Sequence, residues 1–150
     1  MKTYGLLGKS LKHSFSQTYF ASKFAKQLPK DLAKHLSQNL EEWYIYIELE
    51  SIDNIRNRPE ISGLSGFNVT IPYKQEIIQH LDELTPQAKA IGAVNCVEIT
   101  EGRWIGHNTD YIGFRSTLLP LIENRVENAL ILGTGGASLA VAYVLKELGI

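Results

Sequence analysis

The sequence predicts an α/β protein with an open, mostly parallel sheet and helices on both of its faces. Short apolar or β-branched segments alternate with segments whose apolar residues recur every three to four positions. This alternation favours strands joined by helices, and therefore a sheet that is mostly parallel. Towards its end, the chain has a fully apolar segment that leads directly into a glycine-rich turn and another apolar helix. A second unit is therefore expected to begin there.

The first predicted elements enclose a polar loop. Residues 3–7 are largely apolar and precede a glycine, as expected for a buried first strand. After the loop 9–16 a helix is predicted, because Ser16 is a good N-cap and apolar residues return at helical spacing. Those apolar residues are Tyr19, Phe20, Phe24 and Leu28. The following segment, 28–42, suggests no function.

Two strands and two helices are predicted in the middle of the chain. Residues 43–49 are aromatic and β-branched, which is typical of a strand, and residues 63–70 are predicted as another. A short helix at 51–57 is expected to end before Pro59, because the residue before a proline disfavours helical conformation. A second helix is predicted to open at Lys74 and to run through residue 81.

The next segment predicts a helix, a hairpin and a linking helix. Thr85 precedes a proline, which is a good helix start, and Gly92 should end that helix. Residues 93–99 and 103–105 flank a Glu-Gly turn pair and are predicted as two strands of a hairpin. Residues 111–122 then have apolar positions on one helical face. This helix is expected to link two domains.

The apolar segment 129–132 and the turn after it resemble the opening of a Rossmann-type dinucleotide-binding unit. A strand, a glycine-rich turn and a helix over 139–148 are expected in direct succession. Glycines permit a tight turn, and the N–H groups at the start of the helix can bind a pyrophosphate. Plain turn chemistry is the alternative, but the position between strand and helix favours cofactor binding. The candidate cofactor-binding residues are Gly133, Thr134, Gly135, Gly136, Ala137 and Ser138.

The end of the sequence leaves this second unit incomplete. The group that distinguishes NAD from NADP lies roughly 20 residues after the glycine turn, and the sequence ends at Ile150. One strand and one helix cannot form a doubly wound sheet. We therefore expect the 150 residues to be part of a longer protein and to show little or no turnover alone.

Composition excludes several classes of partner. Fifteen basic and sixteen acidic residues give a net charge of −1, so no electrostatic signal points to nucleic acid or to an anionic membrane. The initial apolar stretch is too short for a signal peptide or a membrane span. Cys96 is the only cysteine, which argues against a disulfide framework and a cysteine-cluster metal site and favours a reducing, cytoplasmic location. No metal site is expected.

Polar residues gather where the predicted strands end. Ser14 and Ser16 are two positions apart in an extended loop, so both hydroxyls can reach one ligand, although Ser16 could act only as a helix cap. Asn68 and Thr70 alternate onto one face at the end of a strand, and ligands bind at that edge in open α/β sheets. Lys74 follows in the first turn of a helix, where the dipole disfavours a cation. A nearby carboxylate or ligand would explain its position.

Two further motifs supply an amide and a carboxylate. Asn95 lies in an apolar strand context, so its amide needs hydrogen-bond partners, either backbone groups or ligand hydroxyls. Asp110 follows the next strand and could be only an N-cap. Taken together, these groups suit a small molecule with several hydroxyls. Beside a nicotinamide-binding unit, the implied chemistry is hydride exchange between an alcohol and a ketone.

Five motifs in order resemble the signature of the shikimate dehydrogenase family. They are His13-Ser14-Phe15-Ser16, Asn68 to Lys74, Gly92-Ala93-Val94-Asn95, Asn108-Thr109-Asp110 and Gly133 to Ser138. The resemblance implies a substrate-binding catalytic domain over 1–109, a linking helix over 110–124 and the start of an NADP-binding domain over 125–150. It also implies reversible reduction of 3-dehydroshikimate to shikimate, a step toward chorismate. The implied protein is a monomer or homodimer.

The resemblance assigns roles to individual residues. Lys74 and Asp110 would be catalytic, and the substrate would be bound by Ser14, Ser16, Asn68, Thr70, Lys74, Asn95 and Asp110. Beside a carboxylate Lys74 should be charged at neutral pH, and would therefore donate a proton during ketone reduction. The family often has proline where this chain has Gln17, and the 28–42 link is longer than usual. The alternatives are a quinate/shikimate dehydrogenase that uses NAD, and a non-catalytic polyol-binding module.

Overall fold

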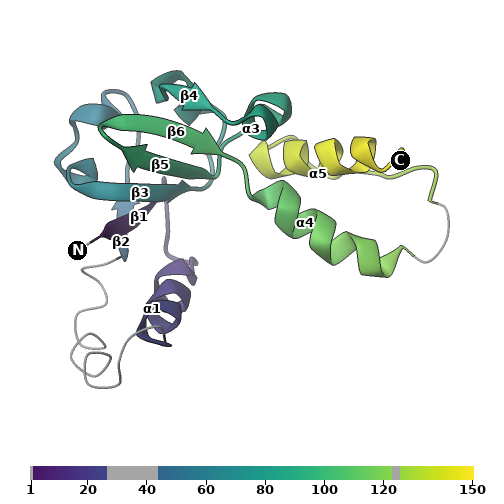
Figure 1. Cartoon of the computed structure of the whole chain (residues 1–150), viewed down its shortest axis with the longest axis horizontal. Coiled ribbons are helices and arrows are strands. Elements are labelled where there is room, and N and C mark those ends of the chain that lie inside the picture. Colours follow the sequence, from purple (N-terminus) through teal and green to yellow (C-terminus); the bar gives the residue numbers. More distant parts are fainter. Residues whose placement is uncertain (1, 27–43, 123–125) are drawn as a thin grey trace.

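The computed structural model describes residues 2–26, 44–122 and 126–150 and contains one mixed sheet (Figure 1). The strand order is β2-β1-β3-β5-β6-β4. The strands are β1 Thr3–Gly8, β2 Tyr44–Glu48, β3 Leu64–Val69, β4 Glu83–Leu84, β5 Cys96–Thr100 and β6 Arg103–His107. These strands confirm those predicted near 3–7, 43–49 and 63–70, and the predicted hairpin. The segment 28–42, for which no function was predicted, lies outside the described residues.

One antiparallel strand determines which chain ends meet. β1 pairs in parallel with β2 and β3, and β4 does so with β6, whereas β5 is antiparallel to both β3 and β6. The sheet is thus mostly parallel, as predicted. Because β5 runs the opposite way, its first residues lie at the edge where β1, β3 and β6 end. Cys96 accordingly pairs with both Asn68 and His107.

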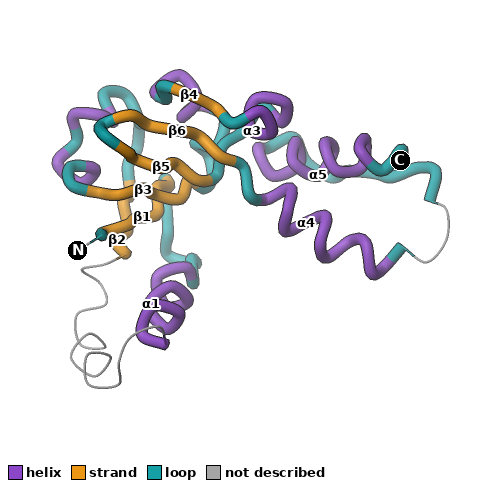
Figure 2. Tube along the Cα trace, in the orientation of Figure 1, coloured by secondary structure: helices purple, strands orange, loops and turns teal. Residues whose placement is uncertain are grey.

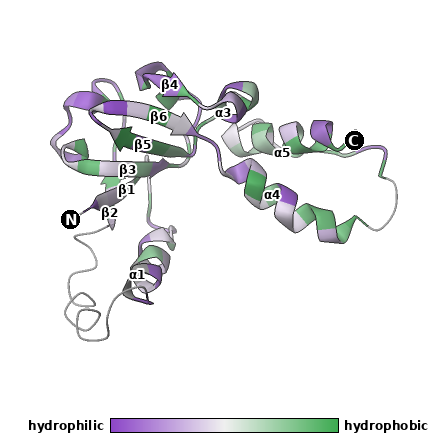
Figure 3. Cartoon of the chain, viewed as in Figure 1, coloured by the Kyte–Doolittle hydropathy of each residue, from purple (hydrophilic) through white to green (hydrophobic). Residues whose placement is uncertain are grey.

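The hydrophobic core lies on one face of the sheet. Strand residues such as Leu7, Phe67 and Val97 point into it and are almost fully buried. That face is covered by three short 3-10 helices, η2 Ile55–Asn57, η3 Pro59–Ile61 and η4 Glu76–His80, each of which contributes a buried isoleucine. Figure 3 shows β5 among the most hydrophobic segments of the sheet. Burial of this apolar surface is the main force that holds the sheet to its helices.

Helices complete the fold on the other side of the sheet and beyond its edge. Helix α1 Ser16–Lys26 packs beside the second face, where Phe20 stacks on Tyr44 at 4.7 Å between ring centroids. Helix α3 Pro86–Ile91 precedes β5, and α4 Asp110–Leu118 lies side by side with α5 Gly136–Glu147 (Figures 1 and 2). A small cluster around Ala93 and Ala140 joins α5 to the rest. Among the described residues, no helix has the length and apolar character needed to cross a membrane.

Two predicted helices are shorter and tighter than expected. The helix predicted at 51–57 is replaced by η2 and η3, which stand on either side of Arg58. The helix predicted to open at Lys74 begins only at Glu76 and is the 3-10 segment η4. In both segments single turns are enough to bury Ile55, Ile61 and Ile77 in the core, and packing of those residues determines the local geometry more than helix propensity does.

The strand predicted at 129–132 is not formed. Residues 126–134 carry no strand assignment, and Leu130 and Leu132 are 84% and 89% exposed. A strand needs neighbouring backbone groups for its hydrogen bonds, and the six-stranded sheet lies elsewhere in the chain. The prediction of a strand at 129–132 is therefore wrong, because no partner strand pairs with this segment in the described part of the chain. The helix that follows is present as α5.

Candidate active site

The polar motifs converge at the edge of the sheet defined by the antiparallel strand β5. Asn68 lies near the end of β3, Asn95 directly precedes β5, and Asp110 opens α4 shortly after β6. The backbone ties these ends together, because the Val69 N–H donates to the Asn95 carbonyl and the Asn95 N–H donates to the His107 carbonyl. Sequence motifs up to 42 positions apart (Asn68 to Asp110) therefore face one region.

Lys74 and Asp110 form an ion pair at the centre of this region. The Lys74 Nζ donates to Asp110 Oδ2 at 2.6 Å, and their side chains are only 15% and 30% exposed. The backbone of Lys74 is fixed as well, since the Val94 N–H donates to its carbonyl at 2.7 Å. Reduced solvent access makes such a charge-assisted bond stronger than an exposed pair. The structure thus supplies the carboxylate partner expected for Lys74.

Asn95 holds the second oxygen of the same carboxylate. Its Nδ2 donates to Asp110 Oδ1 at 2.7 Å and to Thr109 Oγ1 at 2.9 Å, while its Oδ1 accepts from the Thr109 N–H at 2.7 Å. Both amide hydrogens are therefore used within the protein. The partners are a carboxylate, a hydroxyl and one backbone group. This arrangement fixes the orientation of Asp110.

Asn108 supports the turn that carries Asp110. It is 3% exposed; its Nδ2 donates to the Ala93 carbonyl, and its Oδ1 accepts from the N–H groups of Asp110 and Tyr111. Asn108 thus performs the helix-capping role that the sequence suggested for Asp110, and this leaves the Asp110 carboxylate free for Lys74. Its position two residues before the helix was the available signal, because asparagine commonly caps helices.

Asn68 is oriented by a tyrosine that sequence reasoning did not single out. The Tyr44 hydroxyl donates to Asn68 Oδ1 at 2.9 Å, and Asn68 Nδ2 donates to the Asn95 carbonyl at 3.3 Å. Tyr44 is 2% exposed, and this burial raises the pKa of its phenol. The hydroxyl therefore stays protonated and remains a donor. On a strand predicted from its aromatic content, Tyr44 could not be told from an ordinary core residue.

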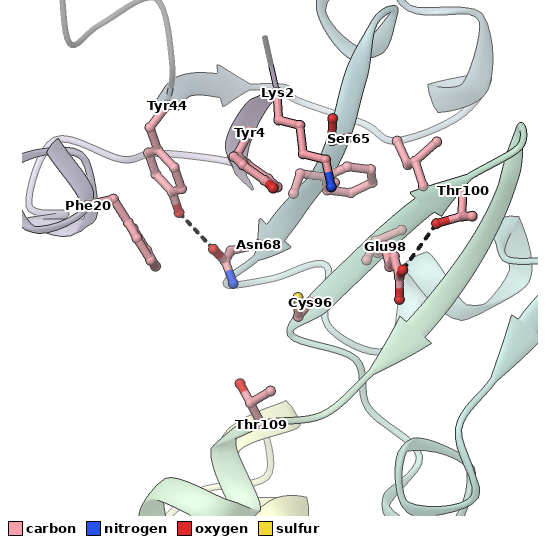
Figure 4. Close-up of a pocket in the computed structure, with 14 residues that line it drawn as sticks. Lys2, Tyr4, Phe20, Tyr44, Ser65, Asn68, Cys96, Glu98, Thr100 and Thr109 are labelled. Atoms are coloured by element: carbon pink, nitrogen blue, oxygen red, sulfur yellow. Dashed lines mark hydrogen bonds between the residues drawn. The ribbon is translucent and has the colours of Figure 1, made fainter. Parts of the chain in front are cut away.

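A cavity of about 670 Å³ extends from Asn68 over the second face of the sheet. Figure 4 shows Asn68 facing Tyr44, with Cys96 and Thr109 across the opening. Thr109 therefore contacts both this cavity and the Asn95–Asp110 network. Burial in the cavity wall raises the pKa of the Cys96 thiol.

The described residues contain no group of three or more histidine, cysteine, aspartate or glutamate side chains that could hold a metal ion.

The serine pair and Thr70 line a neighbouring cavity of about 340 Å³. Ser14 lies in the loop before α1, Ser16 is the first residue of α1, and Thr70 directly follows β3. Ser14 Oγ also accepts from the Ser16 N–H at 3.3 Å, which leaves its own O–H available as a donor. Among the described residues, no hydrogen bond joins these three side chains to the Lys74–Asp110 pair. The structure therefore brings the predicted residues together in two adjacent groups.

The glycine turn lies beside the lysine. An ideal Cβ on Gly136 would lie 2.7 Å from Lys74 Cβ, so the start of α5 directly contacts the lysine stem. Added Cβ atoms on Gly133 and Gly135 would meet nothing within 4 Å, so the turn is open on its outer side. Ser138 Oγ donates to the Gly135 carbonyl at 2.6 Å. An open glycine turn at the start of a helix of 12 residues fits a phosphate group.

Comparisons with known proteins identify a family and several relatives that this chain resembles. The family model "Shikimate dehydrogenase substrate binding domain" matches residues 6–97, more than half of the chain. The chain is 46% identical over 114 residues to a shikimate dehydrogenase (NADP(+)) of Staphylococcus haemolyticus, covering 73% of this chain and 42% of that protein. It is 36% identical over 148 residues to one of Pyrococcus abyssi, covering 99% and 52%.

A solved structure gives the same result for the fold. Shikimate 5-dehydrogenase from Thermus thermophilus, in complex with NADP(H) and shikimate, superposes with a TM-score of 0.76 at 35% identity. That match covers 100% of this chain and 54% of the other. The chain thus spans about half the length of the curated relatives that it matches. By its family model, its relatives and its fold, the chain belongs to the shikimate dehydrogenase family.

Proposed function

We propose that this chain provides the substrate side of an NADP-dependent shikimate dehydrogenase, which reversibly reduces 3-dehydroshikimate to shikimate on the route to chorismate and the aromatic amino acids. One observation carries the proposal. The ion pair of Lys74 and Asp110 lies at a sheet edge that also bears hydroxyls and amides, with the start of α5 against the lysine. The proposed domains are 1–109 for substrate and 125–150 for the start of the cofactor domain, linked by 110–124.

The proposed chemistry needs one hydride and one proton. When bound, NADPH supplies the hydride to the carbonyl carbon of the substrate. Lys74 donates a proton to the carbonyl oxygen as negative charge develops there, and the product is the alcohol. Asp110 holds the ammonium group at 2.6 Å, and Asn95 holds Asp110. In the oxidative direction the proton returns to the lysine side chain.

Substrate binding is proposed for the groups around this pair. Ser14, Ser16 and Thr70 share one cavity, and their hydroxyls can donate to the substrate carboxylate or accept from its hydroxyls. Asn68 is presented by Tyr44 with a fixed amide orientation, which reduces the entropy lost when a ligand binds. Because both amide hydrogens of Asn95 are used internally, we propose that Asn95 acts on the substrate mainly through Asp110.

The cofactor would be held by the turn Gly133 to Ser138. Backbone N–H groups at the start of α5 would bind the phosphates, and the open outer side of the turn leaves room for them. NADP rather than NAD is supported by the two relatives, both of which are NADP(+)-dependent shikimate dehydrogenases by name, and by the NADP(H) bound in the Thermus thermophilus structure.

The test compares two substrates and two cofactors on the full-length protein. Shikimate with NADP should give the highest kcat/KM, and quinate with NAD should give the lowest. Preference for NAD with both substrates would favour the quinate/shikimate dehydrogenase instead. Calorimetry with shikimate and with each nicotinamide nucleotide tests the third possibility, a non-catalytic polyol-binding module. If shikimate binds but neither nicotinamide nucleotide does, the protein is a polyol-binding module and the proposal is wrong.

Location and assembly remain part of the proposal. A reducing, cytoplasmic compartment is supported by the single cysteine, which cannot form an intrachain disulfide. A monomer or homodimer is proposed, to be checked by light scattering coupled to size-exclusion chromatography. The balanced charge of the chain gives no support to a nucleic-acid partner.

A further inference from the structure

Strand β2 bears three polar side chains on one face, and each contacts the substrate side of the site. Tyr44, Tyr46 and Glu48 alternate along the strand. Tyr44 donates to Asn68, Tyr46 donates to the Ser14 carbonyl, and Glu48 accepts from the Leu11 N–H at 2.6 Å. Two of the three contacts therefore fall on the loop that carries Ser14 and Ser16.

Tyr46 makes the central contact with that loop. Its hydroxyl donates to the Ser14 carbonyl at 2.7 Å and accepts a long bond from the Gln17 N–H at 3.4 Å. Gln17 also hydrogen-bonds to the same strand, since its Nε2 donates to the Tyr44 carbonyl at 3.1 Å. One phenol hydroxyl thus contacts the backbone at Ser14 and at Gln17. Ser16 lies between these two positions in the sequence.

We propose that Tyr46 is a positioning residue for substrate binding, which fixes the direction of the Ser14 and Ser16 hydroxyls. This inference rests on the proposed function. In the loop between β1 and α1, Lys12, His13 and Phe15 are exposed, and Ser14 and Ser16 are only partly buried. Without the phenol hydroxyl, the loop would sample more conformations, and a ligand would have to restrict them on binding. Among the described residues, no hydrogen bond joins Tyr46 to the Lys74–Asp110 pair, so its effect should fall on affinity alone.

The experiment uses Tyr46→Phe in the full-length protein, because this change removes the hydroxyl and keeps the ring. Calorimetry with shikimate in the absence of nucleotide should show a Kd raised about three- to tenfold, the range expected for one hydrogen bond. The kcat should stay within about twofold, and amide hydrogen exchange should speed up over residues 11–17. The control is Tyr19→Phe. Tyr19 is 52% exposed, and this substitution should change none of these values.

A double-mutant cycle separates positioning from general stability. In a Ser14→Ala background, Tyr46→Phe should raise the Kd much less than in the wild type, because the hydroxyl that it positions is gone. Fully additive effects, or an unchanged Kd in Tyr46→Phe, would overturn the inference while the proposed function stands. If the wild type itself fails to bind shikimate, the proposed function fails and the inference falls with it.

Discussion

Gly136 lies directly against the side chain of Lys74, so the turn proposed to hold the cofactor contacts the residue proposed to donate the proton. A Cβ at position 136 would approach Lys74 Cβ to 2.7 Å and Lys74 Cδ to 3.2 Å. The first contact cannot be relieved by rotation of the lysine side chain, because Cβ is fixed to the backbone. The start of α5 would have to move. The glycine is therefore required by the packing of α5 against Lys74.

Gly136→Ala should consequently reduce both stability and turnover. Overpacking of this kind costs about 1–3 kcal/mol of the free energy of unfolding, and displacement of α5 should lower kcat because the lysine and the cofactor turn no longer align. Urea denaturation and steady-state kinetics measure the two effects. Gly113→Ala is the matched control, since nothing lies within 4 Å of its added Cβ, and in helix α4 it should be stabilising by about 0.5–1 kcal/mol. Wild-type stability in Gly136→Ala would show that the packing is looser than described.

Lys74→Ala should remove the proton donor and leave most substrate contacts in place. We expect kcat to fall by roughly 10²–10⁴, the usual contribution of a general acid, and KM for shikimate to change little. Lys89→Ala, on the exposed side of α3, serves as the control and should be active. Near-wild-type turnover of Lys74→Ala in the full-length protein would mean that another group donates the proton.

Local signals made much of the fold predictable. The helix after Thr85 begins and ends as expected, because the Thr85 Oγ1 accepts from the Ala88 N–H and Gly92 takes the left-handed conformation. The Glu101-Gly102 pair forms the turn of the hairpin where it was predicted, and Gly102 has the positive φ that glycine adopts readily. These features depend on residues within a few positions of one another.

Features that depend on distant partners were not predictable. The helix expected at 51–57 became 3-10 turns because Ile55 and Ile61 are positioned by the core. For the site, the motifs predicted that Asn68, Asn95 and Asp110 would gather at one edge of the sheet, but not the contacts among them. Tyr46 and Ser14 are 32 positions apart, and an aromatic residue on a strand gives no sign that its hydroxyl holds a loop.

Asn95→Ala tests how the carboxylate of Asp110 is held. The change removes the acceptor of the Thr109 N–H and the donor to Asp110 Oδ1. Loss of a buried partner costs about 1–3 kcal/mol, so the free energy of unfolding measured in urea should fall by that amount. The exposed Asn57 provides the comparison, and its change to alanine should stay within about 0.5 kcal/mol of wild type. A neutral Asn95→Ala would mean that Asp110 is oriented by Lys74 and Asn108 alone.

Asp82 gives the stability of the fold a defined dependence on pH. Arg56, whose guanidinium donates to its carboxylate at 2.6 Å, and the Trp104 N–H hold the pKa of Asp82 below its ordinary value of 3.8. A lowered folded-state pKa stabilises the protein above the ordinary value, and this contribution is lost as the pH falls through the lowered one. The free energy of unfolding, measured from about pH 6 down to about pH 2, should decline less steeply with falling pH in Asp82→Asn than in the wild type. Arg56→Gln should flatten the profile in the same way, because it removes the largest cause of the shift. Profiles that run parallel to the wild type in both variants would show that other carboxylates govern acid unfolding.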